Sequence, residues 1–345
     1  MSTVATPVRL RAFRSSRDAV ADGAELRRRM DADGYLFLPG LLPREVVAGL
    51  RRQFQAIAAA AGWLRAGTAP DDSVADPNAA CVDPEPAYVA VLKQYYRLEA
   101  LHAIGHHPAV LGLLERMLGE PVLPHPRLVL RNVFPQRPDY TTPAHQDFPH
   151  IQGTPETFSV WLPLGDCPVE RGGLTIAEGT QHDGVVPFRV STGAGGMEAV
   201  DPYEGRWVAG DFAEGDVIVF HSLTVHKALP NLSDRLRQSV DNRYQRVRDP
   251  LVAASLLPYA NILSWDEIYA GWSETRLQRY WEGRFTNIVP FDSRYYEERD
   301  RLAFQMAEAG DATARATLLR IVQRDANAQK REHAAKLLQQ LDRVA

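Results

Sequence analysis

The sequence contains little cysteine and no long apolar run. Its two cysteines, Cys81 and Cys167, lie far apart and form no CxxC pattern, so we expect no disulfide framework and a reducing compartment. No stretch approaches the ~20 apolar residues that a membrane-spanning helix requires. The N-terminus has no apolar segment of the kind found in secretory signals. These features predict a cytoplasmic protein with no membrane partner.

Neither sign of charge dominates the chain. Lys plus Arg number 39 and Asp plus Glu number 43, which gives a formal charge of −4 over 345 residues. This balance offers no electrostatic reason to expect nucleic acid as a partner. Apolar residues make up 45% and charged residues 24%, values that are typical of a soluble globular protein.

The first third of the chain is predicted to be mainly helical. Residues 1–24 are polar and irregular and are interpreted as a flexible N-terminal arm. Residues 65–87 are rich in Pro, Asp and Ala and predict a long loop that acts as a lid over a pocket. The expected elements are a helix over 23–30, a strand over 35–38, a helix from Pro43 and an interrupted helical stretch over 90–118.

From Pro121 to Arg246 the pattern changes to short β-rich runs divided by Gly and Pro. No helix of any length separates these runs, which argues against βαβ units and favours an antiparallel sandwich or barrel. The predicted strands cover residues 127–134, 157–164, 174–177, 216–221 and 238–246.

After Pro250 the signals are helical again. From Asp311 onward the pattern predicts two amphipathic helices. One such pair cannot stand alone, so we expect it to dock on the β core or on a second subunit, which would make a homo-oligomer. The proposed domains are the flexible arm over 1–24, a β-rich core domain over 25–300 with helical insertions, and a helical extension over 301–345.

A metal site is predicted from the segment TTPAHQDFPH. In an extended strand, residues i and i+2 point to the same face, so His145 and Asp147 would project into one cavity. With a second imidazole they would form the 2-His-1-carboxylate set that binds a divalent metal and leaves positions open for further ligands.

The second imidazole is expected on a later strand, where His221 and His226 compete. We favour His226 because Arg237 follows it by eleven residues. A guanidinium there could bind the distal carboxylate of a dicarboxylic co-substrate through two hydrogen bonds. Arg235 is the rival to Arg237 for this role.

These motifs resemble the phytanoyl-CoA dioxygenase family of Fe(II)- and 2-oxoglutarate-dependent oxygenases. The resemblance includes HQD, a late His followed by Arg at +11, and the stretches DGYLFLPGLL, SVWLPLGDC, ERGGLTIAEGTQHDG and GDVIVFHSLTVHKALPNLSDRLRQSV. It covers roughly residues 25–250.

The resemblance implies a mainly β core with flanking helices, namely a double-stranded β-helix (a cupin-like jelly roll). His145, Asp147 and His226 would be the iron ligands. Halogenating relatives carry Gly or Ala in place of the carboxylate, and the intact Asp147 therefore implies oxygenation.

The resemblance also implies a set of co-substrate residues. Arg237 would bind the C5 carboxylate of 2-oxoglutarate, with Asn132 and Trp161 nearby. Many relatives carry a small hydroxyl residue two positions after the second His, and here that position is Ala228. Another donor is therefore needed, and Thr142 is the candidate.

The implied activity is a dioxygenase that uses Fe(II), 2-oxoglutarate and O2 to hydroxylate a small organic molecule, with release of succinate and CO2. Desaturation, epimerisation and cyclisation would use the same cofactors, and the sequence does not separate them. A catalytically silent jelly-roll binding protein is the alternative from another class, which the intact triad and Arg237 disfavour.

Overall fold

The computed structural model describes residues 10–137, 141–284 and 287–344. Its centre is a six-stranded sheet in the order β2-β10-β5-β12-β3, with β4 also paired to β12. All neighbouring strands in this sheet are antiparallel. The strands are β2 (Tyr35–Leu38), β3 (Val122–Pro124), β4 (Val129–Val133), β5 (Phe158–Pro163), β10 (Val217–His221) and β12 (Arg237–Arg246).

A smaller sheet, in the order β1-β9-β6-β11, faces the larger one. Trp161, Ile218 and Phe220 of the larger sheet pack against Ile176 and Val208 of the smaller sheet. Both sheets are open at their edges, and together they form the jelly-roll core. The strands of the smaller sheet are β1 (Arg11–Ala12), β6 (Leu174–Ala177), β9 (Trp207–Ala209) and β11 (His226–Ala228).

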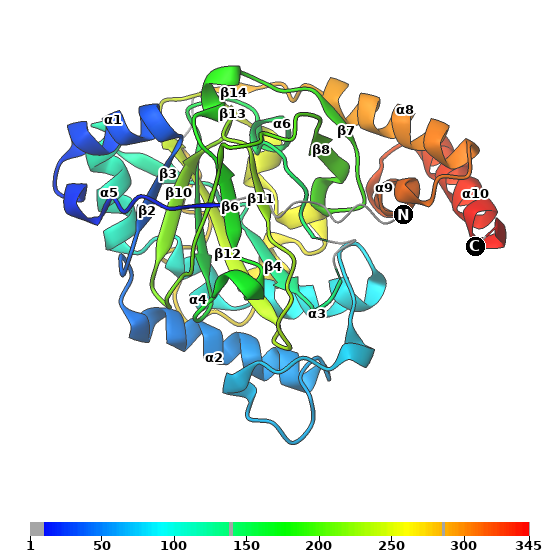
Figure 1. Ribbon diagram of the computed structural model, residues 1–345, viewed down its shortest axis with the longest axis horizontal. Coiled ribbons are helices and arrows are strands. Elements are labelled where there is room, and N and C mark those ends of the chain that lie inside the picture. Colours follow the sequence, from blue (N-terminus) through cyan, green and yellow to red (C-terminus); the bar gives the residue numbers. More distant parts are fainter. Residues whose placement is uncertain (1–9, 138–140, 285–286, 345) are drawn as a thin grey trace.

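Five helices from the first third of the chain pack on the outer face of the larger sheet (Figure 1). The strands alternate, so that Val217 and Val219 join this outer apolar layer while their neighbours face the smaller sheet. Helix α1 begins after Asp22, whose carboxylate accepts the Glu25 N–H, and ends at Gly34 in the left-handed conformation. The helices are α1 (Gly23–Asp33), α2 (Arg44–Ala60), α3 (Pro86–Tyr96), α4 (Glu99–Ile104) and α5 (Pro108–Leu118).

The chain ends in three helices, drawn in orange and red on the side of the core away from α1 (Figure 1). They are α8 (Arg294–Glu308), α9 (Arg315–Arg324) and α10 (Ala328–Val344). Their apolar faces form a core of their own, in which Ala303, Leu318 and Leu337 pack with Val190 of strand β7. Strand β7 (Phe188–Val190) forms a hairpin with β8 (Met197–Ala199). The extension therefore docks on the jelly roll, through this hairpin.

Most of the expected elements are present, with some additions. The six predicted strands correspond to β2, β4, β5, β6, β10 and β12. The strands that were not predicted include β1, β3, β9, β11 and the β7–β8 hairpin. The loop over 65–87 contains two short 3-10 turns, Pro70–Asp72 and Pro77–Ala79. The C-terminal region has α8 in addition to the two predicted helices, and the domain boundary proposed at residue 300 falls within it. That division stays a prediction.

Part of the predicted N-terminal arm pairs with the core, because β1 lies parallel to β9. Residues 1–9 of the arm lie outside the described residues. No helix in the described part of the chain is long and apolar enough to cross a membrane.

Candidate metal centre

Two histidines and one aspartate converge between the sheets. The backbones of His145 and His226 form an antiparallel bridge, in which each N–H donates to the carbonyl of the other at 2.9 Å. This bridge brings the two imidazole centroids to 4.2 Å. One potential ligand atom from each of His145, Asp147 and His226 lies within 4.8 Å of the others. The three side chains predicted from the sequence are thus adjacent in space.

Both imidazoles are held by backbone carbonyls. The Nδ1 atom of His145 lies 2.7 Å from the carbonyl oxygen of Pro143, and that of His226 lies 3.0 Å from the carbonyl oxygen of Thr224. If each Nδ1 carries its proton, each Nε2 is left with a lone pair for a metal. Burial lowers the pKa of His145 well below its ordinary value, which favours the neutral form that a metal ligand needs.

The carboxylate of Asp147 is oriented by two partners. It accepts a hydrogen bond from the Ser159 hydroxyl and two from Arg243 Nη2, at 3.1 and 3.2 Å. Burial would raise the pKa of Asp147, but the charge of Arg243 and the Ser159 hydrogen bond hold that pKa well below its usual range. Asp147 is therefore an anion at neutral pH, as a carboxylate that binds a metal needs to be.

The expectation of an extended strand through this motif was wrong. Asp147 has helical backbone angles and directly precedes helix α6 (Phe148–Ile151). The chain turns after the His145 bridge because it enters this short helix, which begins with Pro149 in its first turn. The convergence with His145 therefore arises from a turn.

A buried arginine lies in the same cavity. Arg237, at the start of β12, is 3% exposed, and its Nη1 donates to Ser239 Oγ at 2.7 Å. Its Nε has no hydrogen-bond partner, and within the described ranges Arg237 forms no ion pair. A buried guanidinium without a carboxylate is costly, so this position suits an anionic ligand.

The cavity has a volume of about 850 Å³ and contains most of the predicted co-substrate residues. Trp161 lies on its wall, with its ring centroid 6.0 Å from Cζ of Arg237. Thr142 and Ala228 also line it, and the carbonyl oxygen of Thr142 accepts the Ala228 N–H at 3.1 Å. Thr142 therefore lies directly across from the position where the hydroxyl residue is missing.

Asn132 is not part of this cavity. Strand β4 alternates its side chains between the two faces of the sheet, and Asn132 points to the outer face, toward α3. There its Oδ1 accepts a hydrogen bond from Gln238 at 2.8 Å, and its N–H donates to the Tyr88 hydroxyl. The geometry thus gives it no contact with a co-substrate bound at Arg237.

The two rival candidates also lie elsewhere. Arg235 precedes strand β12, is exposed, and donates from Nη1 to the carbonyl of Asp72 at 3.1 Å. His221 ends β10 and lies 3.5 Å from Glu156. Neither lines the cavity, so the geometry favours Arg237 and His226 over these rivals.

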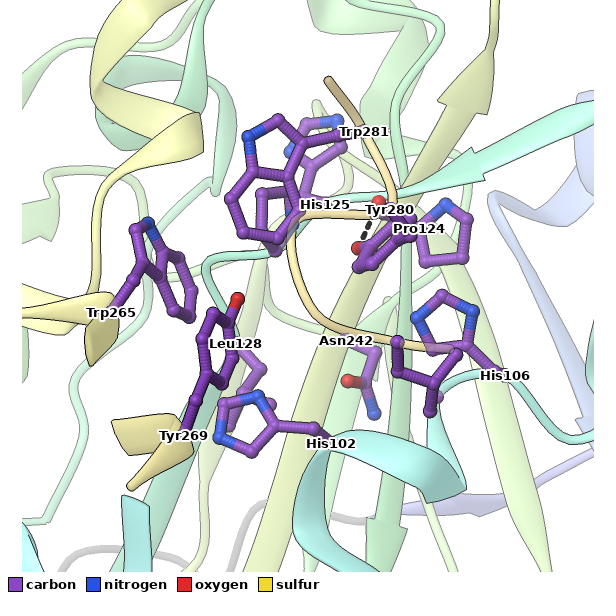
Figure 2. Close-up of a pocket in the computed structure, with 13 residues that line it drawn as sticks. His102, His106, Pro124, His125, Leu128, Asn242, Trp265, Tyr269, Tyr280 and Trp281 are labelled. Atoms are coloured by element: carbon purple, nitrogen blue, oxygen red, sulfur yellow. Dashed lines mark hydrogen bonds between the residues drawn. The ribbon is translucent and has the colours of Figure 1, made fainter. Parts of the chain in front are cut away.

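His102 of helix α4 and His106, which follows that helix, belong to a separate aromatic cluster (Figure 2). His102 Nε2 lies 2.9 Å from the Tyr96 carbonyl, and the His106 ring meets the Tyr280 ring at 4.3 Å. Trp265, at the start of helix α7 (Trp265–Tyr269), lies 6.2 Å from His102. The space that this cluster encloses is only about 10 Å³, so these histidines pack the 265–281 segment onto the core.

The sequence reasoning missed Arg243 and Ser159, which hold Asp147. A signal for Arg243 exists in the alternation along β12, where Arg237, Ser239, Asp241 and Arg243 share one face. Nothing in the local sequence around Ser159 indicates its role, which depends on the pairing of β5 with β12.

The donor set fits iron and 2-oxoglutarate. Two imidazoles and one carboxylate form the arrangement found in non-haem Fe(II) oxygenases, and the unpaired Arg237 matches the second carboxylate of a dicarboxylic acid. A jelly-roll core with this site defines that class of enzyme. A sequence profile of the phytanoyl-CoA dioxygenase (PhyH) family matches residues 30–239, and the chain belongs to this family.

Named relatives are similar over much of the chain. A 1-deoxypentalenic acid 11-beta-hydroxylase from Streptomyces arenae is 29% identical over 240 residues, which cover 65% of this chain and 81% of that protein. An L-proline trans-4-hydroxylase from Streptomyces griseoviridis is 30% identical over 165 residues, covering 41% and 60% respectively.

Among solved structures, the epimerase SnoN in complex with Fe3+, alpha ketoglutarate and nogalamycin RO superposes with a TM-score of 0.48 at 22% identity. The match covers 68% of this chain and 86% of SnoN. From its family membership, the chain is an Fe(II)- and 2-oxoglutarate-dependent oxygenase.

Proposed function

We propose that the chain hydroxylates a small organic molecule in the 850 Å³ cavity, with His145, Asp147 and His226 holding Fe(II) and Arg237 holding 2-oxoglutarate. The observation that carries this proposal is the convergence of the three ligand atoms, within 4.8 Å, in the cavity that contains the unpaired Arg237. The relatives that are named as hydroxylases of small molecules support it.

Each side chain has a defined part in this proposal. The carbonyls of Pro143 and Thr224 fix the two imidazoles, while Arg243 and Ser159 fix the carboxylate of Asp147. These outer contacts keep the ligands in place before the metal arrives.

The end of 2-oxoglutarate that lies away from the metal would be held by a second group of residues. Arg237 would pair with its C5 carboxylate, Trp161 would cover the same wall, and Thr142 would supply the hydroxyl that Ala228 lacks. When bound, Fe(II) and 2-oxoglutarate would supply the electrons that activate O2, so that one oxygen atom is inserted into a substrate C–H bond and the other ends in succinate. Overall, substrate, 2-oxoglutarate and O2 give hydroxylated substrate, succinate and CO2.

The cofactor part of the proposal can be tested without a substrate. Anaerobic addition of Fe(II) and 2-oxoglutarate should produce the weak visible charge-transfer band of the chelate. We expect Asp147→Ala to lose the band. A wild-type protein without the band, unchanged by Asp147→Ala, would contradict the proposal.

The type of reaction is tested by the product. Succinate release triggered by one member of a compound panel identifies the substrate, and mass spectrometry of the product then distinguishes the outcomes. Hydroxylation adds one oxygen, desaturation or oxidative cyclisation removes two hydrogens, and epimerisation leaves the mass unchanged. A product without added oxygen would overturn the hydroxylase assignment. Self-association through the C-terminal helices stays a prediction, which sedimentation velocity would test.

A further inference from the structure

One wall of the cavity carries a cluster of arginines around a single carboxylate. Arg324 Nη2 donates to Asp83 Oδ1 at 2.7 Å, and Arg320 Nη2 lies 3.4 Å from the Asp83 carbonyl oxygen. The Tyr259 hydroxyl donates to Asp83 Oδ2 at 3.2 Å and receives a hydrogen bond from Arg131 Nη1 at 3.3 Å. Asp83 and Tyr259 therefore gather three guanidinium groups, which we call the arginine cluster.

The arginine cluster contains more positive charge than its own carboxylate can balance. Asp83 pairs with Arg324, whereas Arg131 and Arg320 form no ion pair within residues 10–137, 141–284 and 287–344. Arg320 is 6% exposed, and its Nη1 has no hydrogen-bond partner. Its Nη2 donates to the carbonyl oxygens of Gly193, at 3.1 Å, and of Asp83, but these neutral groups do not balance its charge. Burying a guanidinium without an anionic partner is unfavourable, so the cluster suits an anion.

The charge of the whole cavity points the same way. Among the described residues that line it, eight are Arg or Lys and six are Asp or Glu. Several are already paired, since Arg299 and Lys330 both contact Asp300. Fe(II) and the 2-oxoglutarate dianion carry opposite charges that cancel, so their binding leaves the excess of positive charge unchanged.

2-Oxoglutarate does not account for the arginine cluster. Under the proposed function, one of its carboxylates chelates the metal and the other pairs with Arg237. No carboxylate of the co-substrate is left for Arg131 or Arg320. An anion at the arginine cluster must therefore come from another molecule.

We propose that the arginine cluster is a subsite for an oxyanion, carboxylate or phosphate, on the substrate, and that the enzyme acts on acidic molecules. This inference rests on the proposed function, because it names the substrate class of the same cavity. Arg320 and Arg324 lie on helix α9, Asp83 lies in the predicted lid loop and Tyr259 follows β12, so most of the subsite comes from outside strands. Guanidinium groups bind both kinds of oxyanion through paired hydrogen bonds.

Most of the subsite lies outside the part of the chain that the family profile matches. Tyr259, Arg320 and Arg324 lie beyond residue 239, where the family match ends. The metal ligands and Arg237 lie within it. The family-matched part thus holds the reactive centre, and the C-terminal helices hold the anionic end of the substrate.

The test uses three probes that share one chain and differ in the head group: octanoate, octyl phosphate and octanol. Calorimetric titration of the anaerobic enzyme loaded with Fe(II) and 2-oxoglutarate should give at least one anionic probe a Kd roughly tenfold or more below that of octanol. Whether octanoate or octyl phosphate binds more tightly identifies the oxyanion.

Two variants and a matched control localise the binding. Arg320→Gln and Arg131→Gln should each weaken binding of the preferred anion by roughly tenfold or more without changing octanol binding. The control is Arg315→Gln on the same helix, where the side chain is 43% exposed and pairs with Asp342. It should leave all three affinities unchanged. Circular dichroism checks folding, and if Arg320→Gln does not fold, Arg131→Gln carries the test.

Several results would overturn the subsite. The subsite is wrong if neither anion binds more tightly than octanol. It is also wrong if Arg315→Gln weakens anion binding as much as Arg320→Gln and Arg131→Gln do. Loss of the 2-oxoglutarate charge-transfer band in Arg131→Gln or Arg320→Gln, with octanoate binding intact, would assign these arginines to the co-substrate. The two proposals can fail separately. A missing charge-transfer band in wild type loaded with Fe(II) and 2-oxoglutarate contradicts the proposed function. The titrations repeated on metal-free protein still test the subsite through its affinity for the anions.

Discussion

Arg243 donates to both carboxylate oxygens of Asp147, at 3.1 and 3.2 Å. The side chains of the pair are 12% and 4% exposed. In the ladder between β12 and β5, Arg243 lies directly opposite Ser159, the other partner of Asp147. Two neighbouring strands of the larger sheet therefore orient a carboxylate that belongs to neither of them.

This pair predicts an unequal effect of single and double substitutions on the metal-free protein. Asp147→Ala leaves the Arg243 guanidinium buried without its partner and should lower the free energy of unfolding by about 3 kcal/mol. Asp147→Ala combined with Arg243→Met removes both charges and should lose less. Urea unfolding in the presence of a chelator measures these two variants and Arg243→Met alone, and strictly additive losses would show that the pair is not coupled.

Arg237 should determine the affinity for 2-oxoglutarate. Arg237→Gln removes the charge and the fork geometry, and should weaken 2-oxoglutarate binding by roughly 10- to 100-fold, while Arg237→Lys retains part of the affinity. Titration of the charge-transfer band with 2-oxoglutarate measures the effect. Arg235→Gln is the matched control, because that side chain is exposed two residues away and bonds the Asp72 carbonyl. A similar loss of 2-oxoglutarate affinity in Arg235→Gln would contradict the role proposed for Arg237.

Thr142 should compensate for Ala228. Thr142→Val has nearly the same shape but no hydroxyl, and it should weaken 2-oxoglutarate binding several-fold, by about 1 kcal/mol. Ala228→Ser introduced into Thr142→Val should restore much of the affinity, because the two positions face each other across a 3.1 Å hydrogen bond. The same titration applies, and no change in Thr142→Val would mean that its hydroxyl is not used.

Buried histidines should make the protein less stable in acid. Burial lowers the pKa of His102 and of His125 to about 4, against about 6.5 in an unfolded chain. Between these values the unfolded state binds the proton and the folded state does not. Stability is therefore intact above pH 6.5 and falls as the pH drops toward 4, by up to about 1.4 kcal/mol per pH unit for each group.

The variant His102→Gln isolates one of these contributions. Its free energy of unfolding, measured in urea at pH 8, 6.5 and 5, should depend less steeply on pH than that of wild type. His333→Gln on α10 is the control, with a side chain that is 48% exposed. An equal slope in His102→Gln and wild type would argue against a neutral buried His102.

The sequence predicts the β core well because strand signals are local. Strand β6 has the predicted bounds, and β5, β10 and β12 differ from prediction by one or two residues. Strands β9 and β11 have three residues each, too few for a periodic pattern, and their pairing depends on distant partners. Strand β11 carries His226. His226 was therefore chosen from its spacing to Arg237 and not from a strand signal.

The site divides in the same way between local and non-local features. The spacing of His145 and Asp147, and that of His226 and Arg237, are visible in short motifs. The arginine cluster is not, because Arg131 and Arg320 are 189 positions apart and meet only after the C-terminal helices dock on the β7–β8 hairpin. For Asn132 the resemblance predicts a place beside the co-substrate, whereas the alternation of strand β4 turns its side chain to the other face of the sheet.

The docking of α8, α9 and α10 beside the cavity has a consequence for how the enzyme can be changed. The helices have their own apolar core and reach the cavity mainly through polar side chains. Residues at that edge can therefore be exchanged without altering the proposed iron ligands or the strands that hold them. Mutant libraries confined to the cavity-facing positions of α8 and α9 are thus a route to changing the substrate of the enzyme while the proposed iron site stays unchanged.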